Sequence, residues 1–238
     1  MPDLVFKRLE KKFIIDQTQY EDILTTIKSK MEFDPFCVDG KAYRVQNIYF
    51  DSINNDLASL SIRRPVFKEK IRVRKYRDSE VIFLELKKKF DGLVGKRRLV
   101  ISVQELNNLI EKHELPTRES FLDKEALGEI KRVMNLFKLE PRVYLSYDRL
   151  AFFDKNKPNF RISFDNNLHS RREDFDFNND SSTFSLLEEG KYIMEVKSVS
   201  NFPLWFVREL SKLKVYPRSF SKYGSEYELQ LAKIKSKK

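Results

Sequence analysis

The chain has 238 residues, of which 41% are hydrophobic and 34% charged, a balance typical of a folded globular protein rather than a disordered one. A single cysteine, Cys37, excludes an internal disulfide and a CxxC metal site, and the two histidines, His113 and His169, give little support to a histidine-based metal site. The formal net charge of +10 predicts an anionic partner: nucleic acid, an acidic membrane surface or a phosphate-rich small molecule.

No targeting or membrane-spanning segment is expected from the sequence. The start MPDLVFKRLEKKF lacks the apolar core of a signal peptide, and no apolar run is long enough to span a bilayer. We therefore expect a cytoplasmic protein without a transmembrane segment, for which a membrane partner protein is one possible partner.

In the first half of the chain, alternating residues predict strands and a helical spacing of apolar residues predicts helices. Segment 16–31 has an acidic start and carries Ile23, Leu24 and Ile27 at helical spacing. Segments 66–76 and 80–89 are joined by the turn-like residues RDSE and form a hairpin candidate. The expected elements are a strand over 4–16, a helix over 16–31, a strand over 43–51, a short helix or turn over 51–61, and strands over 66–76, 80–89 and 91–102.

In the second half, Ser102 followed by Glu105 forms a capping box that predicts the start of a helix. The polar segment 172–184 predicts a loop. The expected elements are helices over 102–112 and 121–137, strands over 140–154, 159–165 and 191–199, a helix starting near Pro203, and a last helix from Ser225 that frays into a basic tail at 229–238.

These elements indicate an α+β fold. Most strands look antiparallel, and the helices are interspersed without the regular rhythm of βαβ units. A sheet of about eight strands tends to close on itself. We therefore expect a closed antiparallel β-barrel with flanking helices, in a single domain over residues 1–238.

Charged side chains recur on one face of the expected strands, because residues two apart in a strand point the same way. Arg72 and Arg74 share a face, while Ile71 and Val73 point to the other. For any one strand, an ordinary solvated face explains this pattern. The repeated pairs are Glu10 with Lys12, Arg72 with Arg74, Glu85 with Lys87, Lys96 with Arg98, and Glu195 with Lys197.

The repetition also fits a barrel that closes with its charged face inward. Such a barrel forms a basic tunnel, and the repulsion among its guanidinium and ammonium groups calls for a polyanion. Arginine binds phosphate oxygens in a fork, lysine acts as a point charge, and carboxylates can hold Mg²⁺ or Mn²⁺ against phosphates. A triphosphate or polyphosphate would suit such a tunnel, whereas an inward face cannot reach a nucleic-acid duplex. The charge pattern alone leaves both interpretations open.

Eight short motifs, taken in order, connect the sequence with a known family. Together they resemble the VTC domain, the catalytic domain of vacuolar transporter chaperone polyphosphate polymerases, within the CYTH or triphosphate tunnel metalloenzyme superfamily. The resemblance implies a tunnel barrel, a Mn²⁺ or Mg²⁺ ion, and transfer of the γ-phosphate of ATP onto a growing polyphosphate chain. The motifs, between Phe6 and Tyr227, are RLEKKF, IRVRKY, ELKKK, GKRR, YDRLAF, FRISFD, MEVKS and FSKYG.

The resemblance also implies roles for individual residues. Glu195 matches the metal-binding glutamate, with Glu10 and Glu85 as further candidate ligands. The implied catalytic residues are Arg72, Arg74, Lys87, Arg149, Lys222 and Glu195. The implied phosphate-binding residues are Lys12, Arg72, Arg74, Lys87, Lys96, Arg149, Arg161, Lys197, Ser221 and Lys222.

Two departures from the family pattern bear on the activity. Arg8 stands where the wider superfamily often has a glutamate, which fits VTC-type sequences better than triphosphatases, and Ser219 stands where some polymerases of the family carry a lysine. Three functions remain: a polyphosphate polymerase, a hydrolase of triphosphate or short polyphosphate on the same scaffold, or a non-catalytic polyphosphate-binding module. The intact Glu195 argues against the module, and the motifs RLEKKF and FSKYG argue against the hydrolase.

Overall fold

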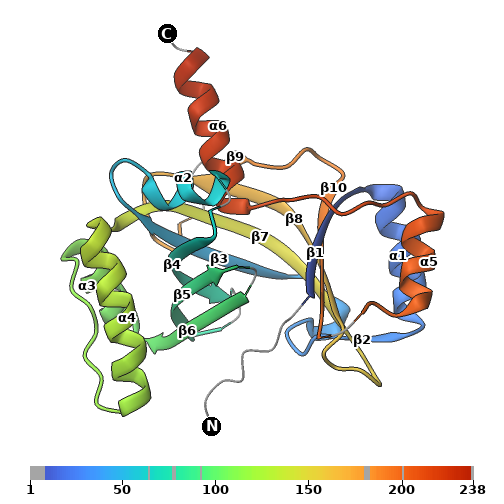
Figure 1. Cartoon of the computed structure of the whole chain (residues 1–238), viewed down its shortest axis with the longest axis horizontal. Coiled ribbons are helices and arrows are strands. Elements are labelled where there is room, and N and C mark those ends of the chain that lie inside the picture. Colours follow the sequence, from blue (N-terminus) through green and yellow to red (C-terminus); the bar gives the residue numbers. More distant parts are fainter. Residues whose placement is uncertain are drawn as a thin grey trace. The chain divides into compact units, whose positions relative to one another are not determined.

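The computed structural model describes residues 9–63, 65–76, 79–91, 93–179, 183–199 and 201–236 (Figure 1). Some predicted features lie outside the described residues. These include residues 4–8 of the first expected strand, with Arg8 of the first motif, residues 77–78 of the expected hairpin turn, residue 92 of the strand expected over 91–102, residues 180–182 of the expected loop, and residues 237–238 of the basic tail.

The chain folds into two compact units, each assembled from three separate segments. Unit 1 comprises Met1–Arg44, Tyr147–Leu168 and Leu187–Phe220, and unit 2 comprises Val45–Ser146, His169–Leu186 and Ser221–Lys238. The chain passes from one unit to the other five times, and three of these crossings lie inside strands, in β3, β7 and β8. No change of composition marks these positions, so the division into two units could not be predicted from the sequence.

The helices and strands follow the predicted order closely, with short additions. In chain order they are β1 (Leu9–Asp16), α1 (Gln17–Lys28), β2 (Met31–Phe33), the 3₁₀ helix η1 (Val38–Gly40), β3 (Tyr43–Asp51), α2 (Asp56–Arg63), β4 (Phe67–Tyr76), β5 (Ile82–Phe90), β6 (Leu93–Ile101), α3 (Val103–Glu111), α4 (Phe121–Phe137), β7 (Glu140–Asp154), β8 (Arg161–Arg171), β9 (Phe184–Ser185), β10 (Lys191–Ser198), α5 (Leu204–Lys212) and α6 (Lys222–Ser236).

The predicted bounds of β3, β7 and α4 are confirmed to the residue. The capping box at the start of α3 is also confirmed: the Ser102 hydroxyl accepts from the Glu105 N–H at 3.1 Å, and the Ser102 N–H donates to the Glu105 carboxylate at 2.8 Å. Two bounds differ. β8 continues past its expected end to Arg171, and α6 begins at Lys222 and runs through Ser236, into the segment expected to fray.

Hydrogen bonds join the strands in the order β1-β10-β8-β7-β3-β4-β5-β6, with β2 beside β7 and β9 beside β8. The strand pairs whose register is assigned are antiparallel, which confirms the α+β class. The expected closure into a barrel is wrong: within the described residues the path ends at β1 and β6, which do not pair with each other.

Other groups occupy the outer edges of these two end strands. On β1, the carbonyl of Lys12 accepts from the backbone N–H of Arg218 at 2.7 Å. On β6, the carbonyl of Val100 accepts from the guanidinium of Arg118 at 2.6 Å. Residue alternation along a strand shows which side chains share a face, but it does not show which strands become edges, so the sequence could not settle the closure.

The core of unit 1 lies between the sheet and two helices, α1 and α5 (Figure 1). Alternation along β1 turns Phe13 and Ile15 into this core and leaves Lys12 on the opposite face. The helices contribute Ile23 and Ile27 from α1, and Phe206 and Leu210 from α5. One face of the unit 1 sheet is therefore apolar and helix-covered, which leaves the other face for the polar residues.

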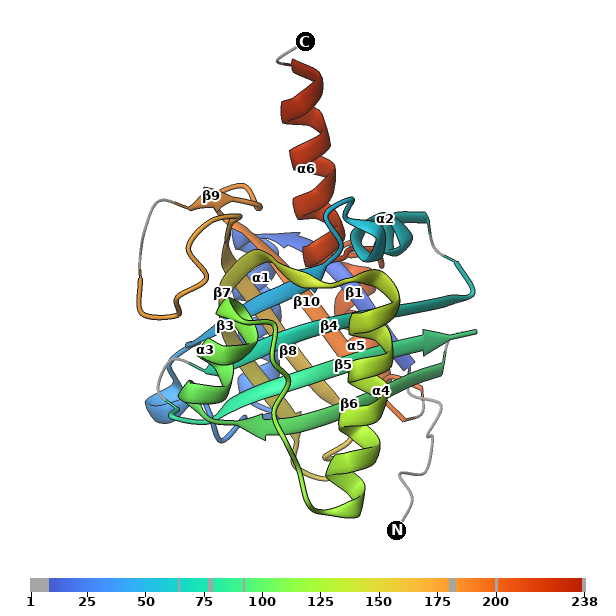
Figure 2. The ribbon, with the colours of Figure 1, turned by 90° about the vertical axis from the view of Figure 1, so that its left-hand side faces the viewer.

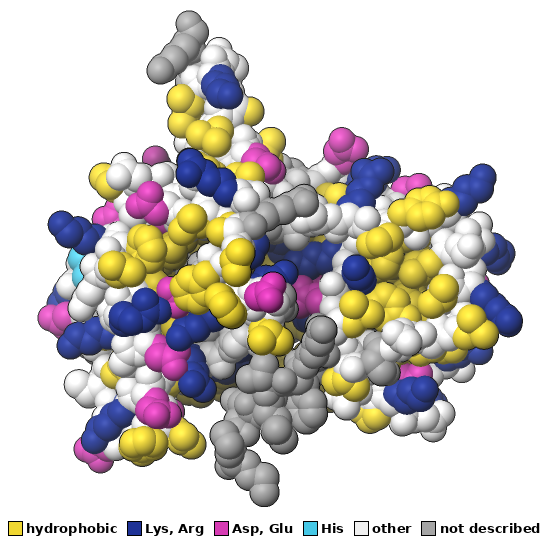
Figure 3. All heavy atoms as spheres, in the orientation of Figure 1, with side chains coloured by type: hydrophobic (Ala, Val, Ile, Leu, Met, Phe, Trp, Pro, Cys, Tyr) yellow, Lys and Arg dark blue, Asp and Glu magenta, His cyan; other side chains and the backbone are white. Residues whose placement is uncertain are grey.

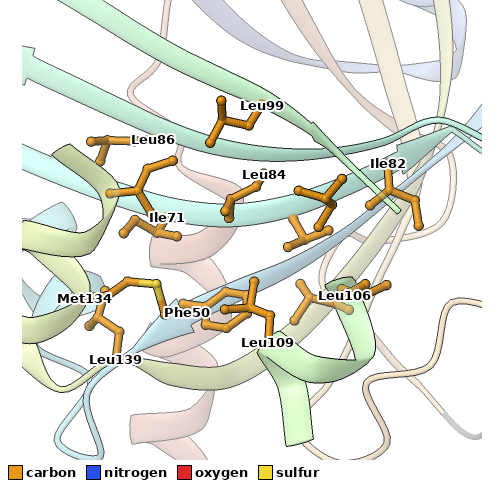
Figure 4. Packing of buried hydrophobic residues seen from close by; sticks show 14 of the residues in the cluster. Phe50, Ile71, Ile82, Leu84, Leu86, Leu99, Leu106, Leu109, Met134 and Leu139 are labelled. Carbon is orange, nitrogen blue, oxygen red and sulfur yellow. The ribbon is translucent and has the colours of Figure 1, made fainter. Parts of the chain in front are cut away.

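The core of unit 2 is built in the same way, with α3 and α4 lying over strands β4, β5 and β6 (Figure 2). Figure 4 shows Ile71, Leu84 and Leu86 from the strands pointing toward Leu109 of α3 and Met134 of α4. Because the side chains alternate, Arg72, Glu85 and their neighbours on the same strands point away from this core.

Apolar side chains also remain on the surface. In unit 1, Leu204 and Val207 of α5 are exposed, and in unit 2, Leu229 and Ile234 are exposed on α6, along which Figure 3 shows several hydrophobic side chains. Among the described residues, no helix is both long enough and apolar enough to cross a bilayer.

Candidate functional site: two charged sheet faces

The polar face of unit 2 is formed by side chains from four neighbouring strands, and we name it the β4–β6 face. Register places Tyr49 opposite Arg72, Arg72 opposite Glu85, and Glu85 opposite Arg98. Lys87 lies opposite both Lys70 and Lys96. The face comprises Asn47 and Tyr49 of β3, Lys70, Arg72 and Arg74 of β4, Glu85 and Lys87 of β5, and Lys96 and Arg98 of β6.

Glu85 stands at the centre of this face and is 1% exposed. One carboxylate oxygen accepts from Arg72 at 2.7 and 2.9 Å, and the other accepts from Lys96 at 2.6 Å and from Arg98 at 2.6 and 2.8 Å. Burial raises the pKa of Glu85, but the charges of Arg72, Arg74 and Lys96 lower it by more, so the pKa lies well below its usual range. Glu85 is therefore ionised, and its single negative charge leaves the surrounding cations in excess.

Neutral side chains of β3 orient the two arginines of β4. The Arg74 guanidinium donates to the Asn47 side-chain oxygen at 2.8 Å and is only 7% exposed. The Arg72 guanidinium donates to the Tyr49 hydroxyl at 3.1 Å. Each arginine is thus held by a fixed acceptor, which limits its rotamers before any ligand arrives.

Lys96 lies at the outer strand of the face. Burial, opposed by Glu85 and assisted by the positive charges of Arg98 and Arg72, lowers the pKa of Lys96 to about 8. The side chain keeps 39% of its exposure, so an anion from solution can reach it. Its charge therefore changes within the pH range in which an enzyme can be assayed.

Binding of ATP is expected to weaken as the pH rises from 7 to 9, because Lys96 loses its proton through its pKa of about 8. We expect a change in Kd of about fivefold, measured by calorimetry without metal. The phosphates of ATP contribute little to this change, since the second ionisation of a phosphate monoester, near pKa 6, is about nine-tenths complete at pH 7. Lys96→Arg keeps its charge and should give a Kd that is flat over this interval. A slope that persists in Lys96→Arg would assign the titration to another group.

The start of α6 adds polar groups to unit 2. The Ser221 hydroxyl accepts from the ammonium of Lys70 at 3.0 Å and from the backbone N–H of Gly224 at 3.0 Å. The second bond makes Ser221 the cap of α6, and Lys222 follows as the first helical residue. The structure therefore brings Ser221 to the β4–β6 face through Lys70.

The polar face of unit 1 has a second charged cluster on β1 and β10, which we name the β1–β10 face; it comprises Glu10, Lys12, Glu195 and Lys197. The Lys12 ammonium is 3.7 Å from a Glu10 oxygen, 4.0 Å from a Glu195 oxygen and 3.2 Å from the carbonyl of Phe220, to which it donates. The Lys197 ammonium is 2.5 Å from the other Glu195 oxygen. Glu195 is 8% exposed, so its charge is buried between two lysines.

Arg149 of β7 also belongs to unit 1 and is held in a fork. Its guanidinium donates to both oxygens of the fully buried Asp165 at 2.7 and 2.8 Å, and it lies 5.2 Å from the ring centroid of Tyr147. Burial lowers the pKa of Arg149, but Asp165 and Tyr147 raise it, and the result is well above its usual value. Arg161, by contrast, pairs with Asp34 and is 48% exposed.

The carboxylates of the two faces differ in how well they fit a divalent metal ion. Among the residues that the structure describes, no three His, Cys, Asp or Glu side chains gather at one point. Mg²⁺ usually needs only one or two carboxylates when substrate phosphates complete its shell. Glu195 and Glu10, on paired strands with Lys12 between them, fit that kind of site. The three cations that hold Glu85 do not favour its role as a metal ligand.

The sequence does not single out several residues that build the β4–β6 face. Asn47 and Tyr49 have the pattern of ordinary strand residues, and Lys70 precedes the IRVRKY motif. Alternation places Arg98 on one face with Lys96, but the family resemblance implies no role for it. Asp165, the partner of Arg149, ends the FRISFD motif. Its place beside Arg149 depends on the order of the strands, which alternation alone does not predict.

The fold and its faces define an antiparallel α+β protein in which neighbouring strands present clustered cations. The sequence of residues 7–230, nearly the whole chain, matches the family model of the VTC domain. This chain belongs to the VTC domain family.

The chain was also compared with solved structures. A predicted adenylate cyclase from Bacillus halodurans has a TM-score of 0.57 at 16% identity, over 90% of this chain and 93% of that one, which shows a shared fold. A predicted adenylate cyclase from Vibrio parahaemolyticus has a TM-score of 0.46 at 10% identity, with 90% and 94% covered. A predicted adenylyl cyclase from Hippeastrum, described as having a dominant triphosphatase activity, has a TM-score of 0.46 at 14% identity, with 90% and 93% covered. No curated protein sequence matches the chain significantly.

Proposed function

We propose that this protein is a polyphosphate polymerase, which transfers the γ-phosphate of ATP to the end of an inorganic polyphosphate chain. The observation that carries the proposal is the β4–β6 face, where Arg72, Lys96 and Arg98 surround one buried carboxylate and remain in excess over it. Fixed cations in excess call for a polyanionic ligand. Membership in the VTC domain family supports a phosphorylated one.

In the proposed reaction, the β4–β6 face binds the donor phosphates. The guanidinium groups of Arg72 and Arg74 each donate to two phosphate oxygens, and Lys87 and Lys96 add point charges. Tyr49, Asn47 and Glu85 hold the arginines in place before the donor binds, so less conformational entropy is lost on binding. Lys222, beside the Ser221 cap, and Arg149 in its fork with Asp165 are the other proposed catalytic cations.

On the β1–β10 face, Lys12 and Lys197 neutralise phosphate oxygens, and Glu195 holds Mn²⁺ or Mg²⁺ with Glu10 as its neighbour. That ion, when bound, acts as a Lewis acid that draws negative charge from phosphate oxygens. Glu195 keeps both lysines in place when no phosphate is present. An incoming phosphate would compete with Glu195 for them, and its binding would release the carboxylate from the two ammonium groups.

The transfer itself needs little acid–base help from the protein. A terminal oxygen of the polyphosphate chain forms a bond to the γ-phosphorus of ATP, and the bond from that phosphorus to the oxygen of ADP breaks with its electron pair. The acceptor oxygen is already anionic, so no base has to remove a proton from it. Phosphoryl transfer depends mostly on positioning and charge neutralisation, and these are what the fixed cations supply.

The test is incubation of the purified protein with ATP and Mn²⁺, followed by a polyacrylamide gel stained for polyphosphate, with ADP and free phosphate measured in parallel. A ladder with ADP released in step with polymer is the expected result. ADP and free phosphate without a ladder would replace the polymerase by a triphosphate hydrolase. No turnover together with tight polyphosphate binding would leave a binding module and would direct attention to Ser219, where some family polymerases carry a lysine.

A further inference from the structure

A buried tyrosine attaches the start of α6 to the β4–β6 face. Tyr223 is the second residue of α6 and is 1% exposed. Its ring stacks on that of Tyr49, with 4.5 Å between centroids and 5° between the ring planes. The Lys70 ammonium lies 5.6 Å from the centroid of the same ring. Tyr223 therefore contacts one neutral and one cationic member of the face.

Asp51, the last residue of β3, fixes the hydroxyl of Tyr223. Asp51 is fully buried, and one of its oxygens accepts from the Tyr223 hydroxyl and from the N–H of Ala58 at 2.9 Å. The other oxygen accepts from the N–H groups of Ser52 and Leu57, at 2.8 Å each. Asp51 is thus held in place by the first turn of α2, and its hydrogen bond in turn fixes the position of the Tyr223 hydroxyl.

From Tyr223 the contacts lead to two cations. Tyr49, on which Tyr223 stacks, accepts a hydrogen bond from Arg72 at 3.1 Å. Lys70, above the Tyr223 ring, donates to Ser221 at 3.0 Å, one residue before Lys222. The Tyr223 ring therefore contacts Tyr49, which holds Arg72, and Lys70, which bonds to Ser221. The Tyr223 hydroxyl contacts only Asp51.

We propose that Tyr223, anchored by Asp51, is a positioning residue for phosphate binding: it sets the places of Arg72, through Tyr49, and of Lys70, and it holds Lys222 at the edge of the face. It does not touch the phosphate. The inference rests on the proposed function in that these cations bind phosphate, but it does not depend on the transfer reaction. Since the ring makes the contacts, replacing the ring should weaken binding more than removing the hydroxyl.

The test compares Tyr223→Leu and Tyr223→Phe with the wild-type chain in calorimetric titrations with tripolyphosphate, without metal and at constant salt. We expect Kd to rise about tenfold in Tyr223→Leu, and to stay within about threefold in Tyr223→Phe, which keeps the stacked ring. Tyr49→Phe serves if Tyr223→Leu does not fold. It keeps the stack but removes the acceptor of Arg72, and a rise in Kd of about threefold is expected.

Glu226→Gln is the matched control for stability. Glu226 ties the same helix to Arg172 through two hydrogen bonds of 2.8 Å, and Arg172 also donates to Asn55 at 2.9 Å. These residues lie outside the β4–β6 face. The variant should lower the thermal midpoint as the tyrosine variants do, yet leave Kd for tripolyphosphate within about twofold of wild type.

The outcomes separate the two proposals. The positioning role would be overturned if Tyr223→Leu bound tripolyphosphate as tightly as wild type. It would also be overturned if Glu226→Gln, at a matched thermal midpoint, lost as much affinity for tripolyphosphate as Tyr223→Leu does. A loss confined to Tyr223→Leu supports it even if no polymer is ever formed. Failure of the wild-type protein to bind tripolyphosphate would overturn this inference and the proposed function together.

Discussion

Glu85→Gln should lower the free energy of unfolding by about 3–5 kcal/mol, because it removes the carboxylate that Arg72, Lys96 and Arg98 share in a buried setting. The substitution keeps the size of the side chain but turns an amide donor toward groups that are themselves donors. For a chain of this length we expect the thermal midpoint to fall by roughly 10 °C. The measurement is thermal unfolding followed by circular dichroism at low salt.

Glu129→Gln provides the control for this prediction. Glu129 also binds two cations, Lys88 and Arg97, but its side chain is 28% exposed, so the loss should be about 1 kcal/mol or less. Tripolyphosphate should restore much of the midpoint of Glu85→Gln, because it supplies the missing negative charge. Equal midpoints for Glu85→Gln and wild type would show that the cations do not depend on Glu85.

Wild type and Glu85→Gln should also differ in how their stability depends on pH. The pKa of Glu85 in the folded state lies well below its ordinary value of 4.5, so its charge stabilises the fold above that pH. As the pH falls below 4.5, wild type loses this contribution progressively, while Glu85→Gln has none to lose. The difference in stability between the two proteins should therefore narrow with acidification.

Glu195→Gln should reduce turnover at least about 100-fold while it spares binding of the polyanion. The carboxylate is the proposed holder of the metal, and it also neutralises Lys12 and Lys197. Without it, both ammonium groups are released toward a phosphate. We therefore expect the metal-free Kd for tripolyphosphate to be unchanged or up to about threefold tighter.

Glu32→Gln is the matched control in unit 1, because Glu32 is half exposed and pairs with Lys155 at 3.4 Å. It should leave both turnover and the Kd for tripolyphosphate unchanged. Binding of Mn²⁺ in the presence of a non-transferable triphosphate, followed by electron paramagnetic resonance, gives a readout that does not depend on catalysis. Normal turnover in Glu195→Gln would rule out its assignment as the metal ligand.

Local structure could be predicted from the sequence because it depends on local rules. The strand Tyr43–Asp51 and the helix Phe121–Phe137 follow from periodicity, and the capping box at Ser102 follows from a spacing of three residues. The shared face of Arg72 and Arg74 is likewise fixed by alternation.

The parts that could not be predicted depend on which strands become neighbours. Asp165 is the partner of Arg149 only because β8 lies beside β7, and Asn47 orients Arg74 only because β3 lies beside β4. The open ends at β1 and β6 have the same origin. The sequence predicts a helix from Ser225, whereas in the structure the Ser221 hydroxyl accepts from the Gly224 N–H and caps a helix that begins at Lys222.

The interleaving of the two units has a consequence for how the protein is made. Unit 1 needs the segment Leu187–Phe220, and unit 2 needs Ser221–Lys238, so neither unit is complete until its own late segment has left the ribosome. Both units join segments that are far apart in sequence, a topology that folds slowly. During synthesis the growing chain would therefore expose β-strands before their partners exist, and its yield in a cell should depend on chaperones more than its final stability suggests.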